Sequence, residues 1–146
     1  MLAFRLDESK VKSFMGKLLK ENIFCDFNIR SVDIVAKNRF SVDGEISGGE
    51  AKGFSAWSEI QPLIFEVVKL MGKPSHFKIV LSFKEPMSVH ENASALFLNI
   101  MYENGVVNFT TATAQKAFTL ERTLDSTWDE WMRRFFVSGG IIVNER

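Results

Sequence analysis

The sequence contains little of what usually identifies a class of protein by composition alone. Its single cysteine, Cys25, cannot form an intramolecular disulfide, so the chain is not a disulfide-stabilised scaffold. No apolar run approaches the ~20 residues of a membrane-spanning helix, which predicts no membrane insertion. The N-terminal segment carries Arg5, Asp7 and Lys10 where a secretory signal would be apolar, so we expect a cytoplasmic protein.

A net charge is also absent, because 18 Lys and Arg residues balance 18 Asp and Glu residues. The formal net charge of +0 at pH 7 gives no general field that would attract nucleic acid, anionic lipid or an acidic substrate. We therefore expect nucleic-acid binding to be weak or absent, and any such contact to be a local patch.

What the sequence does contain is enough apolar surface for a folded core. Of the 146 residues, 46% are hydrophobic and 12% aromatic, which lets an ordinary globular domain bury most of its apolar surface. We find no repeat, low-complexity tract or linker, and we predict a single domain over residues 1–146.

Three segments carry the signals of amphipathic helices. The first is ESKVKSFMGKLLKEN, whose apolar residues have helical spacing and whose opposite side shows lysines. The second is SEIQPLIFEVVKLMGKP, in which Ser58 and Gln61 have the spacing of a capping box. The third follows Ser126 and Thr127, each with an acidic residue three positions later, and is expected to end at Gly139.

Alternating patterns predict strands between these helices. The stretch HFKIVLSFK places its apolar residues on one face of a strand, and MLAFRL is a shorter candidate. The alternation that begins at Phe24 changes phase at the dipeptide RS, which indicates a bend in the strand. Further strands are expected around Phe40 and Val42, in AFTLE and in IIVNE.

The strongest local signal is a hairpin within ALFLNIMYENGVVNFTTAT. The Asn-Gly dipeptide at 104–105 suits a two-residue type I′ turn between two strand-like runs. A turn of that length pairs Tyr102 with Val107 and Ile100 with Phe109. Because these residues then share one face, the turn and the hydrophobic pattern predict the same register.

The order of elements predicts an α+β fold with a mostly antiparallel sheet, two amphipathic helices on one face and a C-terminal helix. This order resembles one domain of the DNA sliding clamps, in which paired helices lie on one face of a curved sheet. The resemblance covers residues 1–113, and residues 114–146 form a helical extension. It is carried by MLAFRL, by FCDFNIRSVDIVAKNRFSVDGEI and by WSEIQPLIFEVVKLMGKPSHFKIVLSF.

In clamps the helices face DNA and are basic. The resemblance therefore implies possible nucleic-acid or partner contacts on the first helix, at Lys10, Lys12, Lys17 and Lys20. Glu59 and Glu66 on the second helix depart from that pattern. The simpler alternative is that these lysines form the solvated face of an amphipathic helix. Short chance matches to an uncharacterised bacterial protein family are a second alternative.

The loop GGEAKGFS approaches the pattern of a phosphate-binding loop without matching it. Gly48 and Gly53 have the required spacing, but Phe54 stands where the loop needs its lysine, and Glu50 adds a negative charge. We therefore expect a connecting loop, no nucleotide and no other cofactor.

Candidate catalytic and metal-binding residues are few and dispersed. Cys25 needs a base to act as a nucleophile, and His76 and His90 lie far from it in the sequence. We expect a small core cysteine, although its reactivity stays open. The two histidines lack metal-ligand spacing, and Asp43 and Glu45 are expected on a solvated edge. We predict no catalytic, cofactor or metal residue.

The segment DEWMRRFF, residues 129–136, presents two alternatives. Met132, Phe135 and Phe136 have the spacing of the short peptide with which replication proteins dock onto eukaryotic-type clamps, with Asp129 in place of its glutamine. Ordinary packing also explains the pattern, because Trp128, Trp131, Met132 and Phe135 form one helical stripe. We expect that stripe in the core, with Phe136 left at its edge as a possible partner contact.

These observations favour a non-catalytic binding or scaffold protein with a clamp-like fold. Its partner would be another protein or a second copy of the chain. The alternative is a small cytoplasmic enzyme whose active site the sequence does not reveal. A deep pocket with convergent polar groups would favour the enzyme, and a shallow surface would favour the binding protein.

Overall fold

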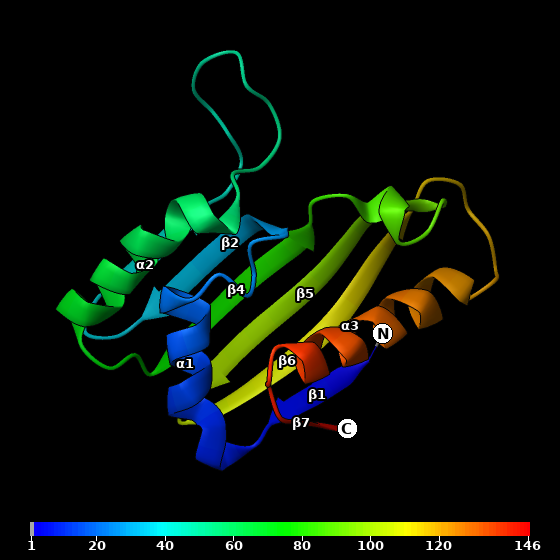
Figure 1. Cartoon of the computed structure of the whole chain (residues 1–146). Helices are drawn as coiled ribbons and strands as arrows, with labels where there is room; N and C mark the ends of the chain where they lie inside the picture. Colours follow the sequence, from blue (N-terminus) through cyan, green and yellow to red (C-terminus); the bar gives the residue numbers. More distant parts are fainter. Residues whose placement is uncertain (1) are drawn as a thin grey trace.

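The computed structural model describes residues 2–146, in which a seven-stranded antiparallel sheet supports the whole fold (Figure 1). The strand order across the sheet is β3-β2-β4-β5-β6-β1-β7. The strands are β1 (Ala3–Leu6), β2 (Phe27–Val35), β3 (Arg39–Asp43), β4 (His76–Phe83), β5 (Ala93–Glu103), β6 (Val106–Gln115) and β7 (Val143–Glu145). The helices are α1 (Val11–Lys20), α2 (Trp57–Met71) and α3 (Thr123–Ser138), with short 3₁₀ turns η1 (Glu8–Lys10) and η2 (Pro86–Ser88).

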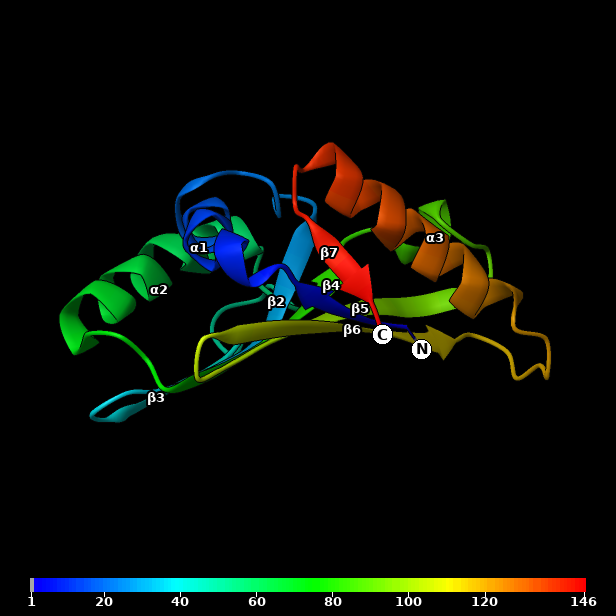
Figure 2. The ribbon, with the colours of Figure 1, turned by 90° about the horizontal axis from the view of Figure 1, so that it is seen from below.

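Helices α1, α2 and α3 lie on the same side of the sheet (Figure 2). The sheet side chains that face them are buried, among them Ile79, Leu98 and Phe109, because alternate residues of a strand point to opposite faces. The predicted α+β class, with an antiparallel sheet, helices on one face and a C-terminal helix, is confirmed.

The hairpin between β5 and β6 has the predicted turn and register. Tyr102 pairs with Val107 and Ile100 pairs with Phe109. The turn residues Asn104 and Gly105 have φ values of 47° and 87°, the left-handed conformation that a type I′ turn requires.

Strand β2 contains the predicted irregularity. Its pairing with β4 shifts between Ile29 and Ser31, so that the chain bulges at Arg30. Gly44 lies against the bulge, where its N–H donates to the carbonyl oxygen of Arg30 at 2.8 Å. From this point the connection to α2 projects away from the body of the molecule (Figure 1).

The predicted helix starts were wrong in two places. Helix α2 begins at Trp57, and the Glu59 side chain, not Gln61, accepts a hydrogen bond from the N–H of Ala56. Gln61 instead donates to the carbonyl oxygens of Leu18 and Glu21, at 2.9 and 2.7 Å. Tertiary contact therefore decides its role, because carbonyl groups at the end of α1 need donors from outside that helix.

Helix α3 begins at Thr123, several residues before the predicted cap. The hydroxyl of Ser126 lies inside the helix and donates to the carbonyl oxygen of Arg122 at 3.1 Å. The strand expected in AFTLE is wrong as well, since residues 117–121 form a loop. The stop at Gly139 and a closing strand within IIVNE are confirmed, the latter as β7.

Candidate partner-binding groove

Helix α3 presents two adjacent stripes of apolar side chains to the rest of the molecule. One stripe is fully buried and consists of Leu124, Trp128, Met132 and Phe136, each no more than 3% exposed. The other consists of Trp131 and Phe135, which are only partly buried. The segment DEWMRRFF thus supplies both the core contacts and an accessible aromatic flank.

The core positions expected for Trp128 and Met132 are confirmed, but the expected edge position of Phe136 was wrong, and Trp131 and Phe135 are only partly buried. Phe136 is 1% exposed and contacts the rings of Phe4 and Phe109, with both centroid distances 5.0 Å. Strands β1 and β6 lie beneath this part of α3, so Phe136 lies on the buried side of the helix. Its side chain is consequently not accessible to a partner of the folded chain.

The rings of Trp131 and Phe135 stack along the flank of α3. Their centroids are 5.5 Å apart with an interplanar angle of 15°, and Trp131 stacks in the same way on Trp128 at 5.1 Å and 20°. The edge of this stack meets Phe83, whose ring centroid lies 4.8 Å from that of Trp131. Stacking of this kind holds the rings in one orientation even where they reach solvent.

The floor under these rings is buried and also aromatic. Phe27 lies 5.6 Å from Phe83, 6.2 Å from Trp131 and 5.6 Å from Phe135 between ring centroids. Phe27 begins β2 and pairs with Phe83 at the end of β4, so the strand register brings the two rings together. We call the surface formed by Phe83, Trp131 and Phe135 over this floor the aromatic groove.

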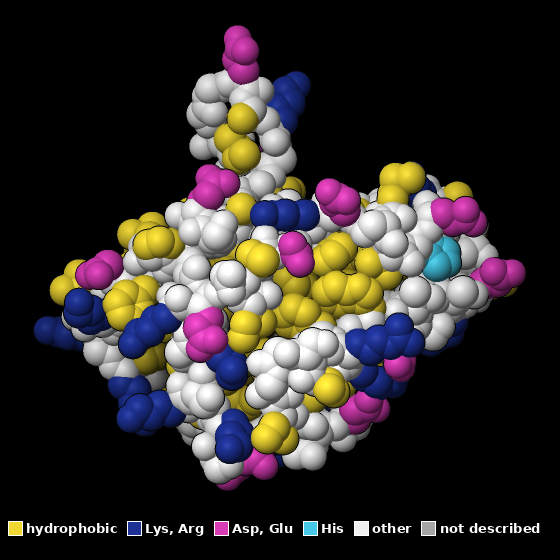
Figure 3. Space-filling model, viewed as in Figure 1, with side chains coloured by type: hydrophobic (Ala, Val, Ile, Leu, Met, Phe, Trp, Pro, Cys, Tyr) yellow, Lys and Arg dark blue, Asp and Glu magenta, His cyan; other side chains and the backbone are white. Residues whose placement is uncertain are grey.

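Figure 3 shows hydrophobic side chains gathered in a hollow on the helix-covered face, between α2 and α3. At Trp131 the aromatic groove continues into an open pocket of about 470 Å³. The pocket is lined by Ser88, Val89, Ser126, Thr127, Glu130, Trp131 and Arg134. The combined surface is therefore apolar at its centre and polar along the α3 side.

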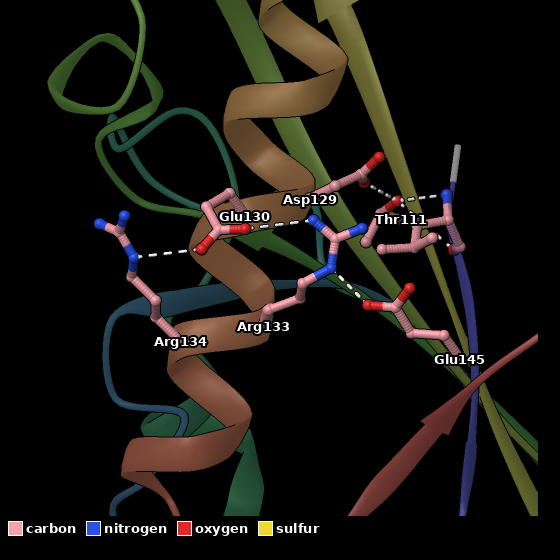
Figure 4. Close-up of polar contacts among 7 residues, drawn as sticks. Thr111, Asp129, Glu130, Arg133, Arg134 and Glu145 are labelled. Carbon is pink, nitrogen blue, oxygen red and sulfur yellow. Dashed lines mark hydrogen bonds and ion pairs between the residues drawn. The ribbon is translucent and has the colours of Figure 1, made fainter.

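Glu130 and Arg134 on α3 form the polar rim, and Arg133 continues their ion-pair network on the other flank of the helix (Figure 4). Glu130 accepts from Arg134 at 3.4 Å and from Arg133 at 3.2 Å, and Arg133 also donates to Glu145 of β7. The hydrogen bond to Glu145 is the main cause that raises the pKa of Arg133 above its ordinary value. Arg134 is 79% exposed at the side chain, so it is the member of this network best placed to meet a ligand.

The lysines predicted on α1 do not form one patch. Lys12 lines a groove between α1 and α2, whereas Lys10 and Lys17 line a small pocket on the other side of α1 that reaches Gly140. Lys20 lies over the ring of Phe65 in α2, 5.2 Å from the centroid. The helical spacing predicts a solvated position for each lysine, but the same spacing places the lysines on different sides of the helix.

The structure places Cys25 differently from the prediction. The cysteine is exposed in the turn between α1 and β2, and its thiol faces the carboxylate of Asp26, with the sulfur 4.0 Å from Oδ1. The two histidines have separate partners, because His76 faces Glu103 and His90 accepts from the N–H of Asn92. Within residues 2–146, no group of three potential ligands is arranged to hold a metal ion.

The loop that approaches a phosphate-binding pattern has a structural role at Phe54. Its ring covers the guanidinium of Arg30, 3.8 Å from the centroid, and Phe97 lies 5.1 Å away. Burial between these rings lowers the pKa of Arg30. Asp43 and Glu45 are exposed, as expected, and the Asp43 carboxylate accepts from the N–H of Glu45.

The sequence pattern does not separate the half-buried aromatic pair from the core, because Trp131 and Phe135 fit the same helical stripe as Trp128. The signal that could have separated them is the width of the apolar face. Six apolar residues between 124 and 136 span more of the helix circumference than one sheet contact can bury.

Residues 17–144 match the model of a protein family described as a family of unknown function, DUF5721. Neither a curated protein nor a solved structure matches the chain. In the part of the chain that the structure describes, no helix has the length and apolar character needed to cross a membrane.

Proposed function

The chain belongs to the DUF5721 family of unknown function, and we propose that it is a non-catalytic binding protein that holds a partner polypeptide in the aromatic groove. The observation that carries the proposal is the contact of three large, partly exposed aromatic rings, Phe83, Trp131 and Phe135. A tryptophan at the centre of such a surface is the kind of residue that dominates interface energetics.

The groove is suited to polypeptide binding because its rings are already fixed before a partner arrives. Trp131 contacts Trp128, Phe83 and Phe135, so little side-chain freedom remains to be lost on binding. A partner that covers the rings removes apolar area from water, which contributes about 25 cal/mol per Å². The exposed Arg134 at the rim can add a polar contact without entering the apolar centre.

The proposal includes a clamp-like layout, which is a similarity of architecture only. What supports it is the order of elements, with α1 and α2 side by side on one face of an antiparallel sheet. The lysines of α1 point to different surroundings, so we assign the binding role to the aromatic groove instead of a basic helix face. A cytoplasmic location is part of the same proposal.

Site-specific photo-crosslinking in the native cell tests the binding role. A photoreactive phenylalanine analogue at position 135 should give a discrete polypeptide adduct, and the substitution Trp131→Ala should abolish it. The matched control is the same analogue at Val137, which is 82% exposed on α3 outside the groove. If position 135 gives no discrete adduct, or if the adduct is unaffected by Trp131→Ala, the proposal fails.

Light scattering of the purified chain then distinguishes the two possible kinds of partner. Self-association that is lost in Trp131→Ala would identify a second copy as the partner. A monomer that still gives the discrete adduct in cells would identify a different polypeptide.

A further inference from the structure

A second groove, distinct from the aromatic groove, lies between α1 and the C-terminal half of α2. Its volume is about 630 Å³, within the ~300–1,000 Å³ range of small-molecule sites. The residues that line it come from η1, α1, α2, the turn after α2, and the strands β4 and β5 with the turn after β5. They include Lys12, Met15, Val68, Lys73, Phe77 and Tyr102.

The floor of this groove is a rigid aromatic pair. Phe77 and Tyr102 stack with centroids 5.1 Å apart and an interplanar angle of 6°, and they are 5% and 6% exposed. The walls are apolar, with Met15 on α1 and Val68 on α2. A groove with such a floor and walls favours a slender apolar chain or ring over water.

The charges of the groove lie at its edge. Lys12 and Lys73 stand on opposite sides, one on α1 and one after α2, and both are exposed. Neither ammonium has a carboxylate within 4.0 Å among the residues that the structure describes. Glu8 also lines the groove, so the charged groups there sum to one net positive charge.

From this combination we infer that the groove binds an amphipathic small-molecule anion. Its apolar chain or ring lies over Phe77 and Tyr102, and its carboxylate or comparable anionic head meets Lys12 and Lys73. The apolar walls supply most of the affinity, and the two ammonium groups select the sign of the head group. This inference does not depend on the polypeptide role proposed for the aromatic groove.

Methionine methyl groups provide the test, because they report separately on each part of the molecule. Sodium decanoate is titrated into the full chain labelled with ¹³C at the methionine methyls, and decyltrimethylammonium is titrated as the cationic counterpart. We expect decanoate to shift the Met15 signal in a saturable manner and to leave Met132, buried under α3, unchanged. The cationic counterpart should give no saturable shift at Met15.

Charge-neutralising variants complete the test. The double variant K12M/K73M should weaken decanoate binding, by about two- to fivefold per lysine. The matched control K20M/K69M removes the same charge at exposed lysines outside the groove and should bind decanoate as the wild type does. Equal binding of the cation, or an unchanged affinity in K12M/K73M, overturns the inference.

The indole N–H signal of Trp131 distinguishes decanoate binding in the α1–α2 groove from decanoate binding at the aromatic groove. A decanoate titration that shifts Trp131 and not Met15 overturns the inference about the α1–α2 groove, and it leaves the polypeptide proposal to its own crosslinking experiment.

Discussion

Trp131 and Phe135 stack on the accessible flank of α3 with ring centroids 5.5 Å apart, whereas Phe136, the next residue, points into the core and meets Phe4 at 5.0 Å. Two neighbouring phenylalanines therefore have different surroundings on the same helix. The first belongs to the aromatic groove, and the second joins α3 to strands β1 and β6.

This difference predicts a stability ranking among alanine variants. Phe136→Ala should lower the free energy of unfolding by about 3–5 kcal/mol, because it leaves a cavity at a side chain that is 1% exposed. Trp131→Ala should cost less, about 2 kcal/mol, because solvent already reaches part of the ring. Urea unfolding of the two variants measures the difference, and a larger loss for Trp131→Ala would contradict the assignment of the two stripes.

The buried hydroxyl of Thr111 should matter more than its size suggests. Thr111 is 0% exposed, accepts from the N–H of Leu2 at 2.9 Å, and donates to the Asp129 carboxylate (Figure 4). Thr111→Val keeps the volume but removes both hydrogen bonds, which should cost about 1–3 kcal/mol. Thr110→Val, on the opposite face of β6, is the control: it loses the hydrogen bond from the Asn99 side chain at 3.1 Å, but this bond is only part-buried, so the urea midpoint should change much less.

Gly44 should resist substitution because of the bulge in β2. An alanine Cβ at this position would lie 1.9 Å from the carbonyl oxygen of Ile29, which the backbone can relieve only by moving. We expect Gly44→Ala to destabilise the fold by about 1–3 kcal/mol. Gly48→Ala in the same connection meets no atom within 4 Å and should be close to neutral in thermal melts.

Acid should remove the contribution of the Asp33 carboxylate to the free energy of unfolding. Its pKa is lowered from 3.8 to about 2, first by the hydrogen bond from Arg39 and then by that from Ser41. Because the folded state binds this proton less tightly than the unfolded state, the stabilisation is present above about pH 4 and is lost as the pH falls toward 2.

The Arg39→Gln variant isolates that effect. Carboxyl NMR titration should show the pKa of Asp33 moving up toward its ordinary 3.8 when the guanidinium is absent. Asp33→Asn should in turn lose less stability than the wild type between pH 7 and pH 2. A pKa for Asp33 that does not change in Arg39→Gln would contradict the ion pair as the cause.

Much of the fold could be predicted because local chemistry determines it. The Asn104-Gly105 turn sets the register of β5 and β6, and the phase change at Arg30 produces the bulge in β2. The role of Gln61 near the start of α2 could not be predicted, because its side chain donates to carbonyl groups of α1 that are distant in the sequence.

The candidate site was harder to predict than the fold for a similar reason. Periodicity identifies the apolar side of α3, but the position of the sheet beneath it decides that Phe136 is covered and Phe135 reaches solvent. Cys25 was assigned to the core from its apolar neighbours, whereas the turn between α1 and β2 directs it outward. Both differences depend on tertiary packing, which the sequence pattern does not contain.

The position of β1 between β6 and β7 has a consequence for the order of folding. Leu2 bonds to Thr111 across a sequence separation of 109 residues, whereas β5 and β6 join through a two-residue turn. Because closing a long loop costs more chain entropy than closing a short one, the central hairpin can assemble early. Strand β1 can join only after β6 is in place, and β7 only after β1, so the sheet grows from its middle toward that edge.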